Sequence, residues 1–369
     1  MSTAYELGYR DGRQAGYQKG VEDGKAAGIR DSVMPLALIV TPAVELPSLE
    51  IILLQPFRVL KQLGIYNFKI RTEHEVTVGD MNSAAIVIVL RSVEPRSIEV
   101  LRAANHAGKP TVYVIDDNFL EIPPGTPVSD YYRDPMRRQI FEALLREASL
   151  VKVDSRFFAD YIRLYFNPRV TSFPSSVDFD LIDPVPKPSA PRPYVVIGYE
   201  GTQKDEDFAP VTPALIRVLQ KYGKAVRLQF YGYAPQELLK FQQVSYSTGQ
   251  IDYRTFMRIL KGSEWDIGLA PLKDSMFNYC KTNNKFREYA ACLIPGIYSI
   301  SPPYVEHIVH GQTGYLVENT EEAWFQGLCA MIDNAVLRET IRIQAWGVSR
   351  QMFHVDACVA NWREHVLHV

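Results

Sequence analysis

The stretch at residues 265–301, WDIGLAPLKDSMFNYCKTNNKFREYAACLIPGIYSIS, decides the fold class. Its apolar start at residues 266–270 predicts a buried strand, and the polar loop that follows leads into a helix at 284–291. A further apolar run at 296–301 predicts the next strand. A strand, a crossover helix and a second strand in this order are typical of a parallel sheet that is covered by helices.

The same alternation continues on both sides of this stretch. Short runs rich in Val, Ile and Leu are typical of parallel strands that are buried on both faces. Before residue 184 we expect strands at 35–41, 84–90, 111–115 and 150–154, and helices at 49–63, 95–107, 134–148 and 156–165. After residue 193 we expect strands at 194–199, 225–231 and near residue 250, and helices at 210–222, 235–243, 253–262 and from 321 onward.

Five prolines between Pro184 and Pro193 separate the two halves of the chain. Closely spaced prolines make an extended and fairly stiff linker. We therefore place one domain at residues 32–183, the linker at 184–193 and a second domain at 194–345. Both halves have the alternation of a Rossmann-like, doubly wound α/β sheet, and two such domains can face a cleft at the carboxyl ends of their strands.

An unusual glycine repeat occupies residues 1–31. Six glycines recur at every fourth position from Gly8 to Gly28, beside tyrosine and aliphatic residues with the same spacing. In a helical arm they would form a groove beside an apolar ridge, a surface suited to close packing and to self-association. Six glycines cost a lone helix about 1 kcal/mol each relative to alanine, so a flexible arm is an equally good interpretation.

The composition excludes several classes of protein. The chain has 369 residues, of which 47% are hydrophobic and 22% charged, and a net charge of −2, which argues against a nucleic-acid partner. No apolar run approaches the ~20 residues of a membrane span, and the N-terminus has no signal-peptide pattern. Four cysteines without a CxxC pair favour a reducing cytoplasm, and we expect neither a disulfide framework nor a metal site.

Several motifs resemble those of GT-B glycosyltransferases of the bacterial group-one, family-four type. Residues 265–301 resemble the family's donor-sugar loop, residues 310–317 (HGQTGYLV) a turn that follows it, and residues 197–202 (IGYEGT) the first strand and glycine turn of its donor domain. Residues 112–118 (VYVIDDN) and 151–156 (VKVDSR) resemble elements of its N-terminal domain. The resemblance covers residues 34–369. It implies the GT-B fold, with a last helix at 346–369 that crosses back to the N-terminal domain.

The resemblance implies that the protein moves a hexose from a nucleotide diphosphate sugar to an acceptor hydroxyl, with retention and without a metal or other cofactor. Lys281 and Lys285 stand where cations would neutralise the departing diphosphate, and Glu288 where family members bind the donor ribose. The turn at Gly201 and Thr202 would let the backbone approach a phosphate closely. The alternative is that these side chains are solvated charges of a loop and a surface helix.

One position departs from the family pattern. Many members carry a second glutamate eight residues before Glu288, and here Cys280 stands in that place. Asn278 or Asp274 could contact the sugar hydroxyls instead. This departure supports an alternative, a catalytically inactive scaffold or binding protein with the GT-B fold. A GT-B nucleotide-sugar epimerase is a third hypothesis.

Asp116 and Asp117 follow the predicted strand at 111–115 and would lie at the edge of the cleft. A carboxylate there could orient or deprotonate the acceptor hydroxyl, although aspartates also cap helices and loops. Arg91, at the end of the strand at 84–90, is a second acceptor-side candidate. The acceptor itself is undetermined, since a carbohydrate, a glycolipid or a protein would all suit. We expect a cytoplasmic protein, either free or peripheral at the inner membrane face.

Overall fold

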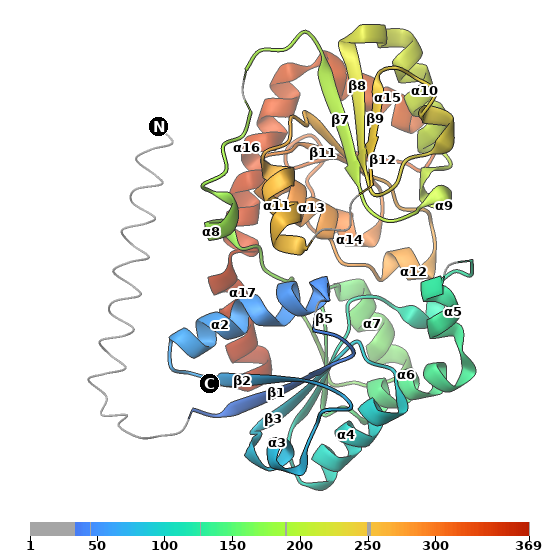
Figure 1. Cartoon of the computed structure of the whole chain (residues 1–369). Coiled ribbons are helices and arrows are strands. Elements are labelled where there is room, and N and C mark those ends of the chain that lie inside the picture. The colour runs from blue at the N-terminus through green and yellow to red at the C-terminus, as the bar shows by residue number, and fades with distance from the viewer. Residues whose placement is uncertain (1–33, 45, 126, 189, 249–251, 369) are drawn as a thin grey trace.

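The computed structural model describes residues 34–44, 46–125, 127–188, 190–248 and 252–368. The glycine repeat of residues 1–31 lies outside the described residues. The described chain forms two α/β domains, one above the other in Figure 1, each built on a six-stranded parallel sheet. The prediction of two doubly wound, Rossmann-like domains is therefore confirmed.

In the N-terminal domain the strand order is β2-β1-β3-β4-β5-β6, and every neighbouring pair is parallel. The strands are β1 (Leu36–Thr41), β2 (Asn67–Thr72), β3 (Ile86–Leu90), β4 (Thr111–Val114), β5 (Leu150–Val153) and β6 (Val170–Ser172). The helices before the proline-rich linker are η1 (Leu49–Leu54), α2 (Gln55–Gln62), α3 (Val78–Ser83), α4 (Pro95–His106), η2 (Phe119–Glu121), α5 (Pro127–Arg133), α6 (Pro135–Glu147), α7 (Arg156–Tyr165) and α8 (Phe179–Ile182), of which α8 packs in the C-terminal domain.

Successive residues of a strand point to opposite faces of the sheet, so each strand supplies two cores. Leu38 and Val40 of β1 belong to the core on one face of the sheet, to which α4, α6 and α7 also contribute. Ala37 and Ile39 pack with η1 and α2 on the other face. Burial on both faces explains the uninterrupted Val and Ile runs of these strands.

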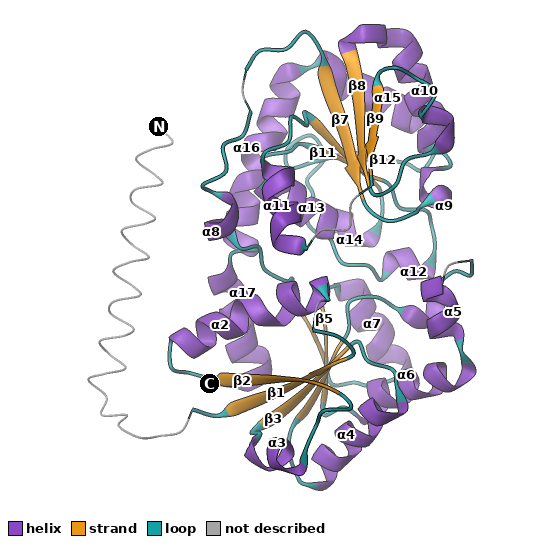
Figure 2. Ribbon diagram, in the orientation of Figure 1, coloured by secondary structure: helices purple, strands orange, loops and turns teal. Residues whose placement is uncertain are grey.

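In the C-terminal domain the strand order is β12-β11-β10-β7-β8-β9 (Figure 2). The strands are β7 (Val195–Glu200), β8 (Val226–Tyr231), β9 (Val244–Ser247), β10 (Ile267–Ala270), β11 (Gly296–Ser299) and β12 (Tyr315–Val317). The helices are α9 (Asp205–Phe208), α10 (Val211–Tyr222), η3 (Gly223–Ala225), η4 (Gln236–Leu238), α11 (Tyr253–Lys261), α12 (Met276–Tyr279), α13 (Asn284–Ala291), α14 (Pro302–Val305), α15 (Glu321–Asp333), α16 (Ala335–Met352), α17 (Val355–Trp362) and η5 (Arg363–Leu367). Counted from β7, this is the Rossmann strand order 3-2-1-4-5-6. All six strands are parallel, and the order in which the chain adds strands reverses between β7 and β10.

The C-terminal segment returns to the N-terminal domain. The indole of Trp362 in α17 is fully buried and meets the ring of Phe57 in α2 edge-on, with ring centroids 5.2 Å apart. The helix expected at 346–369 is in fact two elements, because residue 346 lies inside α16 and the crossing helix α17 begins at Val355. Figure 1 shows α17 beside α2, below α16.

The boundary placed at residue 183 also differs from the packing. Val177 and Phe179 belong to the core of the C-terminal domain, and the backbone N–H of Val177 donates to the carbonyl of Phe353 at 2.7 Å. The N-terminal domain therefore gives way to the C-terminal domain before the proline-rich linker begins.

Two local predictions are wrong. Strand β2 was not predicted, because its six half-buried residues alternate polar and apolar side chains at the sheet edge. The helix expected at 235–243 is a single 3-10 turn, η4, and the edge strand that follows, β9, begins at Val244. Short edge elements carry a weak pattern because only part of their surface is buried.

Candidate active site

The carboxyl ends of strands from both sheets contribute to one cavity of about 150 Å³ between the domains. Two of its lining residues follow β4 of the N-terminal domain, and the others belong to the C-terminal domain. The lining residues are Asp116, Asp117, Tyr199, Lys204, Ala270, Pro271, Leu272, Lys281, Thr282, Asn284, Lys285 and Tyr304. In open α/β sheets, ligands bind at this edge, where the strand order reverses.

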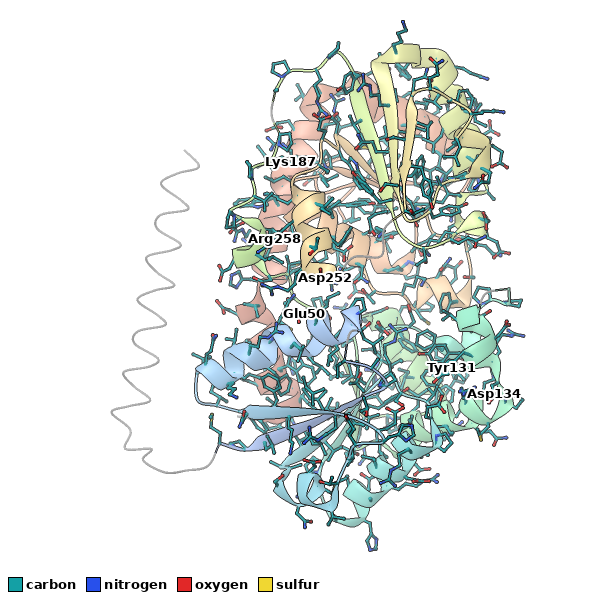
Figure 3. All side chains as sticks on the ribbon, viewed as in Figure 1. Glu50, Tyr131, Asp134, Lys187, Asp252 and Arg258 are labelled. Carbon is teal, nitrogen blue, oxygen red and sulfur yellow. The ribbon has the colours of Figure 1, made fainter. Side chains whose placement is uncertain are left out.

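The domains also meet on either side of this cavity. On the linker side, Arg254 of α11 bridges Glu50 of η1 at 3.5 Å and Asp178 at 3.0 Å. Figure 3 labels Glu50 below Asp252, which precedes α11, and shows the two on opposite sides of the domain boundary. On the other side the ring of Phe277 packs against the core of the N-terminal domain. The described conformation is therefore a closed one.

Three lysines of the C-terminal domain line the cavity, and each already has a carboxylate partner. Lys281 Nζ lies 3.4 Å from Asp117 Oδ1, across the domain boundary. Lys285 forms an ion pair with Glu200, the last residue of β7. The third, Lys204 Nζ, lies 2.8 Å from Asp207 Oδ2. Burial lowers the pKa of Lys281 and of Lys285. The charge of Asp117 opposes the shift at Lys281, and the charge of Glu288 opposes it at Lys285.

Helix α13 begins at the cavity, since Thr282, Asn284 and Lys285 line it. The first N–H groups of a helix are unsatisfied and carry a partial positive charge, which suits an anion. Glu288 lies one turn further along α13, is 5% exposed and does not line the cavity. Burial raises the pKa of Glu288, and the charges of Lys285 and Arg287 oppose that shift.

On the N-terminal side, Asp116 is held by two neighbours. Its Oδ2 accepts hydrogen bonds from Ser48 Oγ at 2.6 Å and from Arg91 Nη1 at 3.2 Å. The guanidinium of Arg91 lies 4.9 Å from the centroid of Phe119, and its backbone adopts a φ of 56°, which is rare for a residue with a Cβ. Arg91 is therefore fixed beside Asp116 by packing, an ion pair and the local backbone.

The two aspartates have opposite shifts. Burial raises the pKa of Asp116, and the charge of Arg91 only partly offsets it. Burial also acts to raise the pKa of Asp117, but the charges of Lys281 and Arg91 outweigh it and hold that pKa below its usual value. Adjacent carboxyl groups with divergent pKa values can take different roles in one site.

The donor-loop candidates Asn278 and Asp274 do not line the cavity, and neither does Cys280, which stands in place of the family's glutamate. Both amide hydrogens of Asn278 are used internally, because Nδ2 donates to Asp207 Oδ1 at 2.8 Å and to the carbonyl of Lys273 at 2.9 Å. Cys280 is fully buried in the core of the N-terminal domain, and its sulfur accepts from Asn118 Nδ2 at 3.5 Å. Asn278 thus shapes the loop, and Cys280 helps to attach it to the opposite domain.

Gly201 and Thr202 follow β7 but are not among the residues that line the cavity. The glycine is needed for its backbone, which has a φ of 149°, and a Cβ there would lie 2.6 Å from the hydroxyl of Tyr199. Thr202 is exposed.

Several residues at or behind the site were not predicted from the sequence, namely Tyr199, Glu200, Lys204, Arg287 and Tyr304. Glu200 could have been found, because it directly follows the predicted strand at 194–199 and precedes the glycine turn. Arg287 is fully buried, with its Nη1 3.8 Å from Asp154 Oδ2 of the other domain. Because Arg287 lies in a polar stretch of a predicted helix, the sequence did not predict that its side chain is buried. Among the described residues, no group of three or more His, Cys, Asp and Glu side chains is arranged to hold a metal ion.

No protein-family model and no curated protein matches this chain. Solved structures do resemble it. HepE of Anabaena in complex with UDP and glucose has a TM-score of 0.64 at 14% identity, covering 90% of this chain and 100% of that chain. Sucrose-phosphate synthase from Thermosynechococcus elongatus has a TM-score of 0.67 at 13% identity, covering 91% and 99%. A glycosyltransferase from Rickettsia africae has a TM-score of 0.63 at 14% identity, covering 92% and 100%.

These likenesses cover 90–92% of the chain, so they include both domains. The chain therefore has the GT-B fold, as the motif resemblance implied. At 11–15% identity they establish the fold, and the chemistry has to be argued from the site.

Proposed function

We propose that this protein is a glycosyltransferase that moves a hexose from a nucleoside diphosphate sugar to an acceptor hydroxyl, with retention and without a metal. The observation that carries the proposal is the cavity between the domains. There the start of α13, Lys281 and Lys285 face Asp116 and Asp117 across the boundary. The similar fold of HepE, which was solved with UDP and glucose, supports a nucleotide-sugar donor.

In this proposal the donor's diphosphate lies at the start of α13. When the bond to the sugar breaks, negative charge grows on the departing diphosphate. Lys281, Lys285 and the free N–H groups of α13 would stabilise that charge, and they would do so most strongly in a cavity that excludes water. Glu288, behind them on the same helix, would bind the donor ribose.

The acceptor hydroxyl would approach from the N-terminal domain, beside Asp116 and Asp117. Because Ser48 and Arg91 hold Asp116 in place, we assign it the orientation of the acceptor rather than attack on the sugar. Retention would follow if the acceptor attacks from the face that the diphosphate leaves, with a phosphate oxygen taking the acceptor proton.

The size of the cavity sets a further requirement. Pockets that bury a drug-sized ligand usually measure about 300–1,000 Å³. The cavity of about 150 Å³ is too small for a complete nucleotide sugar. The domains must therefore separate to admit the donor, and closure would then exclude water from the reacting sugar.

The alternative functions differ from this proposal in the partners they require. An inactive scaffold or binding protein would transfer nothing, and failure to bind any nucleoside diphosphate would favour it. The internal pairing of all three cavity lysines supports this alternative. An epimerase would convert a nucleotide sugar without an acceptor, and the fold is also similar to a putative UDP-N-acetylglucosamine 2-epimerase from Listeria monocytogenes, with a TM-score of 0.56 at 11% identity. The acceptor could be a carbohydrate, a glycolipid or a protein.

We propose a cytoplasmic location, either free or at the inner membrane face. None of the described helices combines the length and the apolar character that crossing a bilayer requires. Self-association through the glycine repeat is also a proposal, which gel filtration of the full chain and of a chain lacking residues 1–31 would test.

The test is a screen of UDP-, GDP- and dTDP-sugars for hydrolysis, transfer and epimerisation, followed by two variants of the donor site. Lys285→Ala and Glu288→Ala should abolish turnover while cooperative thermal unfolding shows that each variant remains folded. Lys240→Ala, which removes an exposed lysine of the same domain, is the matched control and should turn over normally. Normal turnover by the two site variants would refute the site assignment.

A further inference from the structure

The cations proposed to receive the diphosphate are already neutralised inside the closed cleft. Lys281 forms an ion pair with Asp117, and Lys285 forms one with Glu200. These four side chains are each less than a quarter exposed, so solvent screens the two ion pairs only in part. An anionic ligand therefore meets two competing carboxylates rather than two free ammonium groups.

The third ion pair in the cavity, between Lys204 and Asp207, differs because its carboxylate also binds the loop. Asp207 Oδ1 accepts the backbone N–H of Lys273 and the amide of Asn278, both at 2.8 Å, while its Oδ2 pairs with Lys204. These bonds make Asp207 part of the loop structure. By contrast, Lys281 is the one side-chain hydrogen-bond partner recorded for Asp117 within the described chain, and Lys285 is the one ion-pair partner recorded for Glu200. Asp117 and Glu200 can therefore release their lysines without breaking the loop.

On the basis of the proposed function, we propose that the donor binds by ion-pair exchange, in which its diphosphate replaces two carboxylates as the partner of two lysines. The two phosphate groups of the donor's diphosphate form ion pairs with Lys281 and Lys285. Asp117 and Glu200 are positioning residues that hold these lysines until the donor binds. The exchange frees the Asp117 carboxylate on the acceptor side of the cavity. The donor therefore binds first, and the acceptor hydroxyl then finds an unpaired hydrogen-bond acceptor.

The surroundings of Asp117 favour this order. After Lys281 has turned to the diphosphate, the charges of Arg91 and Lys204 still act on Asp117 and keep it ionised. Before the exchange, its oxygen is engaged with Lys281 and is a poorer acceptor for a substrate hydroxyl. Diphosphate oxygens, like the carboxylates that they replace, form charge-assisted hydrogen bonds with lysine, so both lysines keep an anionic partner through the exchange.

The experiment measures nucleotide affinity after each competing carboxylate is removed. The wild type is titrated with UDP, GDP and dTDP by calorimetry, and the nucleotide that binds is then titrated into Asp117→Asn and Glu200→Gln. Each variant should bind it about three- to tenfold more tightly, as expected when one partly buried competitor is removed. Asp117→Asn should at the same time lose most of its transfer activity and raise the KM of the acceptor.

Asp205→Asn is the matched control for charge alone. Asp205 is an exposed carboxylate near the same cleft whose recorded partners are Gln203 and Tyr233 rather than a lysine. It should change affinity by less than about twofold. Tighter binding with slower transfer cannot arise from poor folding, which would weaken both.

Equal or weaker nucleotide binding by both site variants would overturn the exchange while leaving the proposed function intact. The same gain in all three variants, Asp205→Asn included, would also overturn it, because the effect would then be one of net charge. Failure of the wild type to bind any of the three nucleotides would overturn the proposed function, and the exchange with it.

Discussion

A buried charge network between the domains allows a quantitative prediction. Asp154, at the end of β5, lies between two cations that are both fully buried, Lys152 from its own strand and Arg287 from α13. It also accepts the backbone N–H of Ser175 at 3.2 Å and the Ser175 hydroxyl. Asp154→Asn leaves two buried cations without a counter-charge, which is the costly way to break a buried ion pair.

The expected cost of Asp154→Asn is about 3–5 kcal/mol, or about 4–6 °C in the unfolding midpoint of a chain of this length. Arg287→Met should cost less than about 2 kcal/mol, since Asp154 keeps Lys152 and Ser175. Two nitrogens of the Arg287 guanidinium, Nε and Nη1, have no hydrogen-bond partner among the described residues, so removal of this side chain relieves a desolvation cost.

Thermal and urea unfolding of the two variants beside the wild type would measure this ranking. The pKa of Asp154 is lowered because its cationic neighbours outweigh its burial, so the folded state favours the ionised carboxyl. That contribution is present above about pH 4 and is lost as the pH falls further, and Asp154→Asn should lack this acid-sensitive component. Equal costs for the two variants, or a larger cost for Arg287→Met, would refute the assignment of Asp154 as the counter-charge of both cations.

The remaining predictions concern packing. Trp362→Ala should lower the free energy of unfolding by about 3–5 kcal/mol, because it leaves a cavity where α17 packs on the N-terminal domain. Denaturant titration would measure this loss, and a loss below about 1 kcal/mol would contradict the packing role of Trp362. Gly198→Ala should strongly reduce soluble, folded protein, because a Cβ would lie 1.8 Å from the Trp265 ring, and a normal midpoint would argue against this close packing. Gly347→Ala, in the open middle of α16, is the matched substitution and should stabilise by about 0.5–1 kcal/mol in the same assay.

The sequence predicted most of the fold, for a physical reason. Strands such as β3 are buried on both faces, so their apolar runs are strong and local. Helix α13 has the predicted bounds, Asn284–Ala291. Edge strand β2 is half-buried and was missed, and β9 begins several residues before the predicted position. Element type was therefore predictable where burial was complete and unreliable at the edges.

The site was predictable only in part. The pattern of residues 265–301 placed Lys281 and Lys285 at the cavity, and the end of a strand placed Asp116 and Asp117 there. Pairings across the domains depend on how the two sheets approach each other, which no local pattern encodes. For that reason Glu200 and Arg287 had no predicted role, and Asn278 was assigned to the donor although its amide holds the loop.

The most direct test of the central proposal is the equilibrium binding of nucleoside diphosphates by the wild type, Lys285→Ala and the control Lys240→Ala. The expected result is that the wild type and Lys240→Ala bind one of UDP, GDP and dTDP with equal affinity, and that Lys285→Ala binds it at least tenfold more weakly. Unchanged affinity in Lys285→Ala would contradict the placement of the diphosphate at the start of α13.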